Sequence, residues 1–438
     1  PANTLSGGYE IDNSGLFNDG QSQFLSDTLA GSTNAERRTL TWSAWVKRGS
    51  VTGAIQTLYS TGSGTDDYDY LAFTADEKLQ VFTRDGGNTS GNCITNAVYR
   101  DHSAWYHIVM RIDTTQGTDT NRIRIYVNGT EQSLGTATYP SQNKNLLFNT
   151  AYNVSYIGAT RTNTSSLYFD GYIAEVHNVS GTSSAPTEFA ETNDNGVWVP
   201  KKFSGSYGTN GYFLEFGNTG TGSGAGRFAS DTSGNGSHWD TNNFSGIYQM
   251  TDTPTNNFCT LNPLNPTESN ASFSKGNLAF TNTLNSSPHH ALAVGTFAVA
   301  NGKWYWEAKC EAVGGTAMSI GAIEVTEFAK NDFTGDNGVG YFNNGNFHYR
   351  GTEDSDPNTY TTGDFIGIAL DMDNRAIYFH KNGTYEISGD PTSGASRTGS
   401  AGGTLHASNV TMTPAVSNYN SGNNELNFGN NIHSISSG

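Results

Sequence analysis

The segment Asp66-Asp67-Tyr68-Asp69-Tyr70 carries the densest group of side chains that could bind a ligand. Its three carboxylates fall within four residues, and calcium prefers oxygen ligands on flexible loops. The spacing differs from that of an EF-hand loop, which favours a solvated acidic turn as the alternative interpretation. If a metal binds here, Asp66, Asp67 and Asp69 are the candidate Ca²⁺ ligands, and no other cofactor is predicted.

Tyr68 and Tyr70 are the candidate ligand-binding residues of the same segment. An aromatic ring offers a flat apolar surface and the phenol adds a polar group, so the pair could stack on sugar rings. The alternative interpretation is that both tyrosines cap an edge of a β-sandwich, which is the commoner role. Residues 331–337 form a similar but weaker acidic segment.

The sequence shows no pair of acidic residues with the spacing that glycoside hydrolysis requires. A retaining glycosidase needs two carboxyl groups about 5 Å apart. Glu10 and Asp12 begin a suitable spacing, but Ser14 and Gly15 stand where a further Glu is required. Glu175 has no acidic residue two positions later, and the scattered histidines predict no nucleophilic triad. We therefore predict no catalytic residues and a protein that is not an enzyme, with a polysaccharide hydrolase as an alternative.

The composition predicts a folded chain that is rich in strands. Its 438 residues include 52 glycines, 12% aromatic residues and only 14% charged residues. Abundant Gly, Asn and Thr together with many aromatic residues are typical of short strands joined by tight turns. The formal net charge of −17 and the absence of a basic cluster argue against a nucleic-acid partner. Three widely spaced cysteines predict free thiols rather than a disulfide scaffold.

Several segments show the alternation of a β-strand in the first part of the chain. In residues 40–47 the apolar side chains recur at every second position, which places them on one face. Residues 105–112 form a second predicted strand, and residues 122–130 form a third that ends on an Asn-Gly turn. Residues 169–176 close the series.

These segments contain a Trp-x-x-Trp-Val strand, a Trp-Tyr-His-Ile strand, an Ile-Tyr-Val-Asn-Gly hairpin and a closing Gly-Tyr-Ile-Ala-Glu-Val strand, in that order. The set resembles a laminin-G-like domain of the concanavalin A-like lectin/glucanase superfamily and covers residues 9–180. The family usually carries Asp before the Glu of the closing strand. Ala174 stands at that position here, so the resemblance does not carry a calcium or polar role to it.

The second part of the chain is marked by residues 363–383, which read as two short strands joined by an Asp/Asn turn and followed by an Asn-Gly turn. Residues 302–309, Gly-Lys-Trp-Tyr-Trp-Glu-Ala-Lys, form the entry strand of the same region. Their order and spacing resemble a SPRY domain across residues 271–429. The resemblance implies a binding module on a β-sandwich.

The segment between these regions, residues 181–270, is rich in Gly, Ser, Asn and Thr. It also contains Trp198, Trp239, Phe244 and Phe258, which a flexible tether would lack. We therefore predict an all-β chain of two concanavalin A-like jelly-roll β-sandwiches, residues 1–180 and 271–438, joined by an ordered connector, residues 181–270.

The domain order, the Asn/Gly/Thr-rich style and the Ser-Gly-Asn-Gly-Ser-His-Trp connector resemble structural proteins of marine tailed bacteriophages. The resemblance implies a non-catalytic virion protein, such as a tail fibre, spike or capsid decoration, that binds host-surface glycans or envelope components. Other virion proteins would be its partners. A homo-oligomer, with a trimer favoured, would raise the avidity of weak sugar sites. A purely structural cement or adaptor protein is the first alternative.

The expected location is the virion surface, after synthesis in the host cytoplasm. The N-terminal sequence has no basic region followed by an apolar core, so no signal peptide is predicted. A start at Pro1 is what removal of an initiator methionine would leave. No apolar run approaches the roughly 20 residues of a membrane span, so membrane insertion is not expected.

Overall fold

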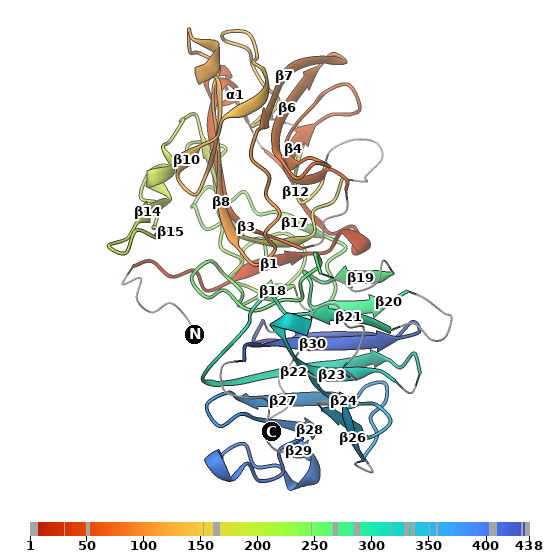
Figure 1. The fold of residues 1–438 in the computed structure, drawn as a ribbon. Coiled ribbons are helices and arrows are strands. Elements are labelled where there is room, and N and C mark those ends of the chain that lie inside the picture. Colours follow the sequence, from red (N-terminus) through yellow and green to blue (C-terminus); the bar gives the residue numbers. More distant parts are fainter. Residues whose placement is uncertain are drawn as a thin grey trace. The chain divides into compact units, whose positions relative to one another are not determined.

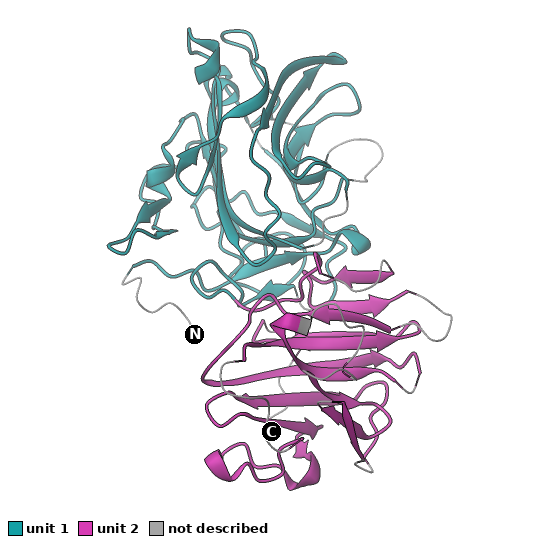
Figure 2. Ribbon diagram, viewed as in Figure 1, with its two compact units in different colours: residues 1–257 teal, residues 258–438 magenta. Residues whose placement is uncertain are grey.

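The computed structural model describes two compact units, residues 1–257 and residues 258–438 (Figure 2). Each unit has its own hydrophobic core between two β-sheets, so the predicted all-β class of β-sandwiches is confirmed. The residues that the structure describes are 8–29, 31–49, 53–151, 153–160, 167–246, 248–265, 270–283, 290–315, 317–327, 333, 338–349, 351–355, 358–402, 410–430 and 432–433.

The first sheet of unit 1, which we call sheet A, has the strand order β10-β9-β8-β3-β13-β1-β18, and β16 also pairs with β13 (Figure 1). All of the pairings are antiparallel. The strands are β1 (Ser14–Phe17), β3 (Thr39–Arg48), β8 (Trp105–Asp113), β9 (Ile123–Val127), β10 (Thr130–Glu131), β13 (Gly171–Ser180), β16 (Tyr212–Leu214) and β18 (Gln249–Met250).

The second sheet of unit 1, sheet B, has the order β11-β7-β6-β5-β4-β12-β2-β17. Its strands are β2 (Phe24–Thr28), β4 (Gln56–Gly62), β5 (Tyr68–Phe73), β6 (Leu79–Asp85), β7 (Asn88–Thr95), β11 (Leu134–Thr138), β12 (Val154–Ile157) and β17 (Asp240–Asn242). A short helix, α1 (Asn34–Arg38), precedes β3, and β14 (Ala190–Thr192) pairs with β15 (Trp198–Pro200) as a separate hairpin.

Alternation along the strands builds the core of unit 1. Trp42 of β3 is fully buried in the core, as the strand pattern predicts. Trp45 lies an odd number of residues later and therefore on the other face, where its ring stacks on His107. Cys93 is buried, and the three cysteines are free thiols as predicted.

Residues 181–257 form part of unit 1 rather than a separate connector. The strands β16, β17 and β18 pair with β13, β2 and β1 respectively. Aromatic side chains of this segment, Tyr212, Phe228 and Trp239, are fully buried in the same core as Trp42. The three-part division expected from the sequence therefore differs from the two units of the structure.

Asp231 anchors the turn of residues 231–237, which begins beside β16. Its carboxylate accepts hydrogen bonds from the backbone N–H groups of Phe213, Ser233, Gly236 and Ser237, at 2.8–3.1 Å. The Ser233 hydroxyl donates to the same carboxylate. An Asp that satisfies this many donors fixes a tight turn. The Ser-Gly-Asn-Gly-Ser sequence is thus explained as a loop wrapped around one buried carboxylate.

Unit 2 is a sandwich of a seven-stranded and a six-stranded sheet, with the orders β19-β20-β31-β22-β27-β28-β29 and β21-β30-β23-β24-β25-β26. The first contains β19 (Ala271–Ser274), β20 (Ala279–Asn282), β22 (Lys303–Ala312), β27 (Phe365–Asp371), β28 (Ala376–Lys381), β29 (Thr384–Tyr385) and β31 (Asn423–Asn427). The second contains β21 (His290–Val294), β23 (Ser319–Glu324), β24 (Gly338–Phe342), β25 (Asn346–Tyr349), β26 (Thr352–Ser355) and β30 (Met412–Tyr419).

The entry strand of unit 2, β22, has a core face and an outer face. Trp306 is buried in the core and Trp304 packs against it, as their even separation predicts. On the opposite face, the carboxylate of Glu307 is fully buried and accepts a hydrogen bond from Tyr305. The Tyr305 hydroxyl also lies 2.7 Å from Nε2 of His380. Unit 2 therefore buries a polar network on the outer face of its larger sheet.

Candidate functional site

The predicted site segment lies in β5 and in the turn before it, and the strand separates its side chains. Leu71 and Phe73 point into the core. Asp69, two residues before Leu71, shares that face, whereas Tyr68 and Tyr70 lie on the outer face of sheet B. The structure therefore brings the two tyrosines together and places Asp69 on the other side of the sheet from them.

Asp69 acts as a buried acceptor for backbone groups. Its side chain is nearly inaccessible and accepts hydrogen bonds from the N–H groups of Leu147 (2.6 Å), Phe148 (3.3 Å) and Arg84 (3.2 Å). Burial raises the pKa of Asp69 to about 7, although these backbone hydrogen bonds act in the opposite direction. This carboxylate holds residues 147 and 148 against sheet B.

Asp66 and Asp67 remain in the exposed turn. The Asp67 carboxylate accepts a hydrogen bond from the Gly86 N–H at 2.6 Å, and Asp66 lies 3.6 Å from the Arg84 guanidinium. In the part of the chain that the structure describes, no group of three or more His, Cys, Asp or Glu side chains could hold a metal ion. Asp66, Asp67 and Asp69 do not converge on one point. The weaker acidic segment, residues 331–337, lies outside the described residues except for position 333.

On the outer face of sheet B, strand register aligns aromatic and small polar residues in one row. Tyr70 pairs with Phe82 on one side and with Ser60 on the other. Ser60 pairs in turn with Tyr156. From β7 to β17 the row, which we call the aromatic row, is Asn92, Phe82, Tyr70, Ser60, Tyr156, Ser26 and Asp240, and Thr138 of β11 pairs with Asn92 beyond it.

Near one end of the aromatic row, the rings of Tyr70 and Phe82 stack with the ring of Tyr68, which lies beside the row on the same face. The centroids of Tyr70 and Phe82 are 5.2 Å apart, and the Tyr68 ring lies 6.0 Å from Tyr70 and 5.7 Å from Phe82. The Tyr70 hydroxyl donates to Oε1 of Gln80, whose amide donates to Oδ1 of Asn92 at 2.7 Å. Tyr70 is only 6% exposed, whereas Tyr68 and Phe82 are half-buried.

A second aromatic group lies across Ser60. Tyr156 of β12 makes an edge contact with Phe24, with centroids 5.2 Å apart, and Phe24 stacks on Tyr168 at 6.1 Å. All three rings are half-buried. Because Tyr70 and Tyr156 are separated by two strand spacings, about 10 Å, the short Ser60 side chain lies between two rings.

The aromatic row combines flat apolar rings with amide and hydroxyl groups, a combination that suits a ligand with apolar and hydrogen-bonding faces. Its single carboxylate, Asp240, is at the far end. The sequence predicted Tyr68 and Tyr70 but not Tyr156, because the partner of each strand is not visible in the sequence. A hydrolase would need two carboxylates near the row, and the row does not supply them.

Glu175, the carboxylate of the predicted closing strand, is buried on the outer face of sheet A. It accepts a hydrogen bond from Tyr9 at 2.9 Å and lies 3.3 Å from Nε2 of His177. Its backbone has φ +52° at the irregularity between Ala174 and His177. The Phe213 ring stacks on His177 at 4.2 Å. This carboxylate is therefore enclosed by neighbouring side chains and is not placed to act on a polymer.

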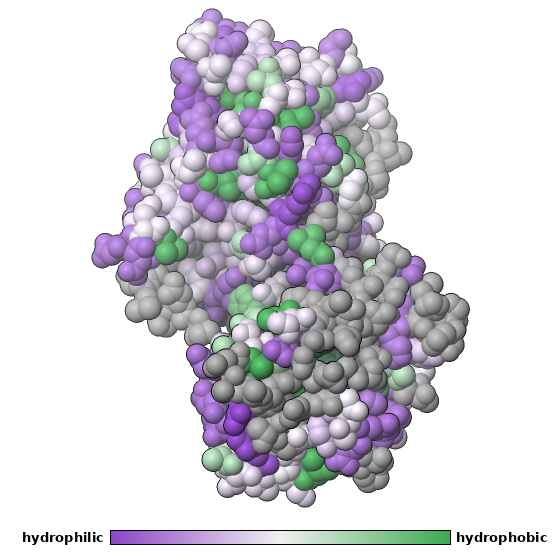
Figure 3. Space-filling model, in the orientation of Figure 1, coloured by the Kyte–Doolittle hydropathy of each residue, from purple (hydrophilic) through white to green (hydrophobic). Residues whose placement is uncertain are grey.

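Exposed large apolar side chains are scattered over the described residues. They are Val98, Val197, Leu264, Tyr305 and Ile387. On the face drawn in Figure 3, hydrophobic residues form small separate patches among hydrophilic ones. Single exposed apolar residues are normal in folded proteins. The aromatic row differs from these scattered residues because strand register places its rings side by side on one face of sheet B.

Residues 19–187 match the family model of the concanavalin A-like lectin/glucanases superfamily, and residues 303–401 match the model of the SPRY domain. The chain carries a concanavalin A-like domain followed by a SPRY domain. The order expected from the sequence is thereby confirmed. The aromatic row lies within the concanavalin A-like domain except for Asp240. The buried polar network of Tyr305, Glu307 and His380 lies within the SPRY domain. No curated protein matches the chain.

Several solved structures resemble parts of the chain. The SPRY domain of human HERC1 is 21% identical with a TM-score of 0.31, and the match covers 38% of this chain and 96% of that one. A candidate carbohydrate binding protein from Bacteroides ovatus ATCC 8483 is 17% identical with a TM-score of 0.38, covering 55% of this chain and 60% of that one. The heptameric SAP-like pentraxin from Limulus polyphemus is 12% identical with a TM-score of 0.30, and the match covers 41% of this chain and 80% of that one.

Within the described residues, none of the helices has the length and apolar character needed to cross a membrane.

Proposed function

We propose that this chain is a non-catalytic carbohydrate-binding protein whose concanavalin A-like domain binds glycans through the aromatic row. The observation that carries the proposal is the register of Tyr70, Ser60 and Tyr156, which places two rings about 10 Å apart with a small residue between them. A sugar ring would pack its C–H groups against Tyr156. A further sugar unit of the same glycan, lying over β6 and β7, would bond through its hydroxyl groups to the amides of Gln80 and Asn92.

The biological setting that we propose is the surface of a bacteriophage particle. This part of the proposal rests on the domain order and the Asn/Gly/Thr-rich style of the sequence. Other virion proteins would then be partners, and the SPRY domain is the candidate for contacting them or a host envelope component. A homo-oligomer, with a trimer favoured, would raise the avidity of weak sugar sites by about 10²–10⁴. Light scattering after size exclusion tests the trimer.

The binding experiment compares the full chain with Tyr156→Ala and Tyr156→Phe. Laminarin, dextran and mannan serve as neutral probes in affinity gel electrophoresis, and a thermal melt checks that each variant folds. We expect retardation by at least one probe, loss of at least tenfold in affinity for Tyr156→Ala, and little change for Tyr156→Phe because the ring is kept. Equal affinity of Tyr156→Ala and the unchanged protein would refute the role of the row.

Two alternatives give different outcomes. If the chain is only a cement or adaptor protein, its depletion weakens particles without altering adsorption to the host, and the protein migrates unretarded through gels that contain each of the three polysaccharides. If it is a polysaccharide hydrolase, new reducing ends accumulate when it is incubated with the same polysaccharides. We expect no such release, because the row supplies one terminal carboxylate instead of the required pair.

A further inference from the structure

Two arginines lie directly opposite each other on the outer face of sheet A. Arg111 of β8 pairs in register with Arg124 of β9. Their neighbours Ile112 and Ile123 point into the core, so both guanidinium groups are on the opposite face. Like charges placed directly across a strand pair are destabilising. The pairing therefore calls for a compensating group.

Compensation within the protein reaches one of the two arginines. Glu131 Oε1 lies 3.5 Å from Nε of Arg124, and Asn121 accepts a hydrogen bond from the same guanidinium. Arg111 instead donates to neutral oxygens, those of Ser183 and the Tyr126 hydroxyl. Among the described residues, no carboxylate lies within ion-pair distance of Arg111.

The same contacts fix the Arg111 guanidinium in place. Its Nη2 donates to the Ser183 carbonyl at 2.8 Å, and Nε donates to the Ser183 hydroxyl at 3.3 Å. The guanidinium carbon lies 5.7 Å from the centroid of the Tyr126 ring. An arginine carries five N–H donors, so two of those on Arg111 remain after these bonds. Pre-organised donors lose little entropy when they bind a ligand.

The two arginines line a cavity of about 200 Å³ whose lining residues are all polar or charged. The nearby carboxylate, Asp113, is already engaged, because it accepts hydrogen bonds from Thr115 and from the side-chain amide of Gln116. These bonds orient Gln116, and among the described residues Asp113 forms no ion pair with Arg111. The lining residues are Arg111, Asp113, Gln116, Asn121, Arg124 and Ser183.

We infer that this cavity binds the anionic group of an acidic sugar, a carboxylate or a sulfate ester, between Arg111 and Arg124. A guanidinium group can donate two parallel N–H bonds to two oxygens of a carboxylate or of a sulfate ester. The side chains of Gln116 and Asn121 also line the cavity, where their amides could bond sugar hydroxyls. The cavity is smaller than the 300–1,000 Å³ or so of sites for larger ligands, which suits a single sugar ring.

This inference goes beyond the proposed function and stands without it, because the cavity and the aromatic row are on different sheets of unit 1. The chain as a whole has a net charge of −17, so an anionic ligand is repelled at long range. Recognition of an anion therefore depends on donors at close range. A chain with both sites would recognise a polysaccharide that carries neutral and acidic residues.

In the test, the full chain is titrated with glucuronate, galactose 6-sulfate, glucose and inorganic sulfate. Isothermal calorimetry measures the affinity for each probe, and NMR records the changes in amide chemical shift. We expect glucuronate or galactose 6-sulfate to bind at least tenfold more tightly than glucose and to shift the amides of Gln116 and Ser183. Arg124→Gln should weaken this binding at least tenfold. The matched control is Arg100→Gln, which removes the same charge from an exposed position of unit 1.

The remaining outcomes separate the possibilities. Preference for glucuronate identifies a carboxylate site, and preference for galactose 6-sulfate identifies a sulfate site; each supports the inference. Equal binding of inorganic sulfate and of the acidic sugars, or loss with Arg100→Gln as large as with Arg124→Gln, overturns it. Absence of shifts at Gln116 and Ser183 in the unchanged protein also overturns it. Tyr156→Ala should leave glucuronate binding unaltered, so failure of the aromatic row is recognised separately.

Discussion

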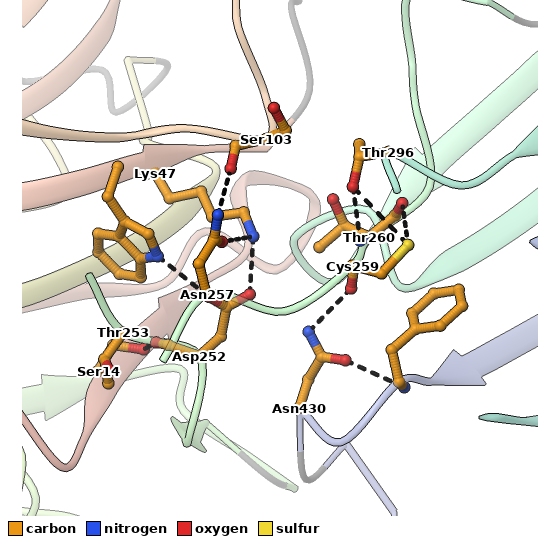
Figure 4. A network of polar contacts seen from close by, with 12 residues as sticks. Ser14, Lys47, Ser103, Asp252, Thr253, Asn257, Cys259, Thr260, Thr296 and Asn430 are labelled. Carbon is orange, nitrogen blue, oxygen red and sulfur yellow. Dashed lines mark hydrogen bonds and ion pairs between the residues drawn. The ribbon is translucent and has the colours of Figure 1, made fainter. Parts of the chain in front are cut away.

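Lys47 and Asp252 form a fully buried ion pair within unit 1, with Nζ 2.8 Å from the carboxylate oxygen (Figure 4). The second carboxylate oxygen accepts a hydrogen bond from the Trp105 indole at 3.0 Å. Asn257 accepts from the same Nζ and donates to the Ser103 carbonyl. Strands β3 and β8 are thereby attached to the last residues of unit 1.

Replacing Asp252 by Ala should destabilise unit 1 strongly. The change leaves the Lys47 ammonium buried without its counter-charge, and breaking one member of a buried pair costs about 3–5 kcal/mol. The double replacement Lys47→Met with Asp252→Leu should be much less destabilising, because both charges are removed. Urea unfolding measures both free energies of unfolding. A loss of under about 1 kcal/mol for Asp252→Ala would contradict the assignment.

Much of the strand framework could be predicted because each pattern is local. Residues 40–47 and 105–112 were expected as strands, and the structure has β3 at Thr39–Arg48 and β8 at Trp105–Asp113. Period-two alternation of apolar residues needs no knowledge of the partner strand. The same logic predicted that Trp42 and Trp45 lie on opposite faces with one of them in the core, and the structure shows that the core residue is Trp42.

The role of residues 181–257 could not be predicted, because it depends on pairing between distant segments. The strand β16 has only three residues, too few for a clear period, and its partner β13 lies more than thirty residues earlier. The buried pair of Lys47 with Asp252 joins residues 205 positions apart. A Gly- and Ser-rich composition indicates turns but does not say which sheet they serve.

Only part of the candidate site could be predicted from the sequence, again because the rest depends on pairing between distant segments. Tyr68 and Tyr70 are two positions apart in the sequence, whereas Tyr156 joins the aromatic row only through the register of β4 with β5 and β12. That register includes an irregularity between Thr57 and Tyr59, and a shift of one residue would move every side chain to the other face. Asp69 shows the opposite case, because it stands between the two tyrosines in the sequence but its side chain points to the other face of the sheet.

Gly367→Ala should destabilise unit 2. A Cβ atom at this position would overlap the Nε2 atom of His380, which crosses the sheet above Gly367. Displacing this ring breaks its contact with Tyr305, and overpacking of this kind costs about 1–3 kcal/mol. The control is Gly117→Ala, where the added atom meets open space. Unfolding followed by circular dichroism should show a loss for the first variant only, and similar stability of the two variants would be evidence against this packing.

The stability of unit 1 should carry a pH dependence from Asp69. Because burial raises its folded pKa to about 7 from 3.8, the neutral form is favoured in the folded state. Its contribution is fully present below pH 3.8 and is lost as pH rises toward 7. The stability difference between the unchanged protein and Asp69→Asn should therefore decrease over this range, by at most about 1.4 kcal/mol per pH unit.

Urea unfolding at pH 4, 5.5 and 7 measures this difference, and Asp67→Asn in the exposed turn is the control. A constant difference at all three pH values would mean that the three backbone hydrogen bonds keep Asp69 ionised throughout. In that case the pKa measured by carboxyl NMR should lie near or below 3.8 instead of about 7.

Glu425 should give unit 2 the opposite dependence. Burial opposes ionisation of this carboxyl, but hydrogen bonds from His433 and Lys275 outweigh burial and lower its pKa. Its contribution is therefore present above the ordinary value of 4.5 and is lost as pH falls through the lower folded pKa. Below pH 4.5, the free energy of unfolding of unit 2 should fall more steeply with decreasing pH in the unchanged protein than in Glu425→Gln. Replacing Glu353, a more exposed carboxylate of the same unit, by Gln should leave the acid slope unchanged. Identical slopes for the unchanged protein and Glu425→Gln would show that the pair with His433 does not hold the charged form in the folded state.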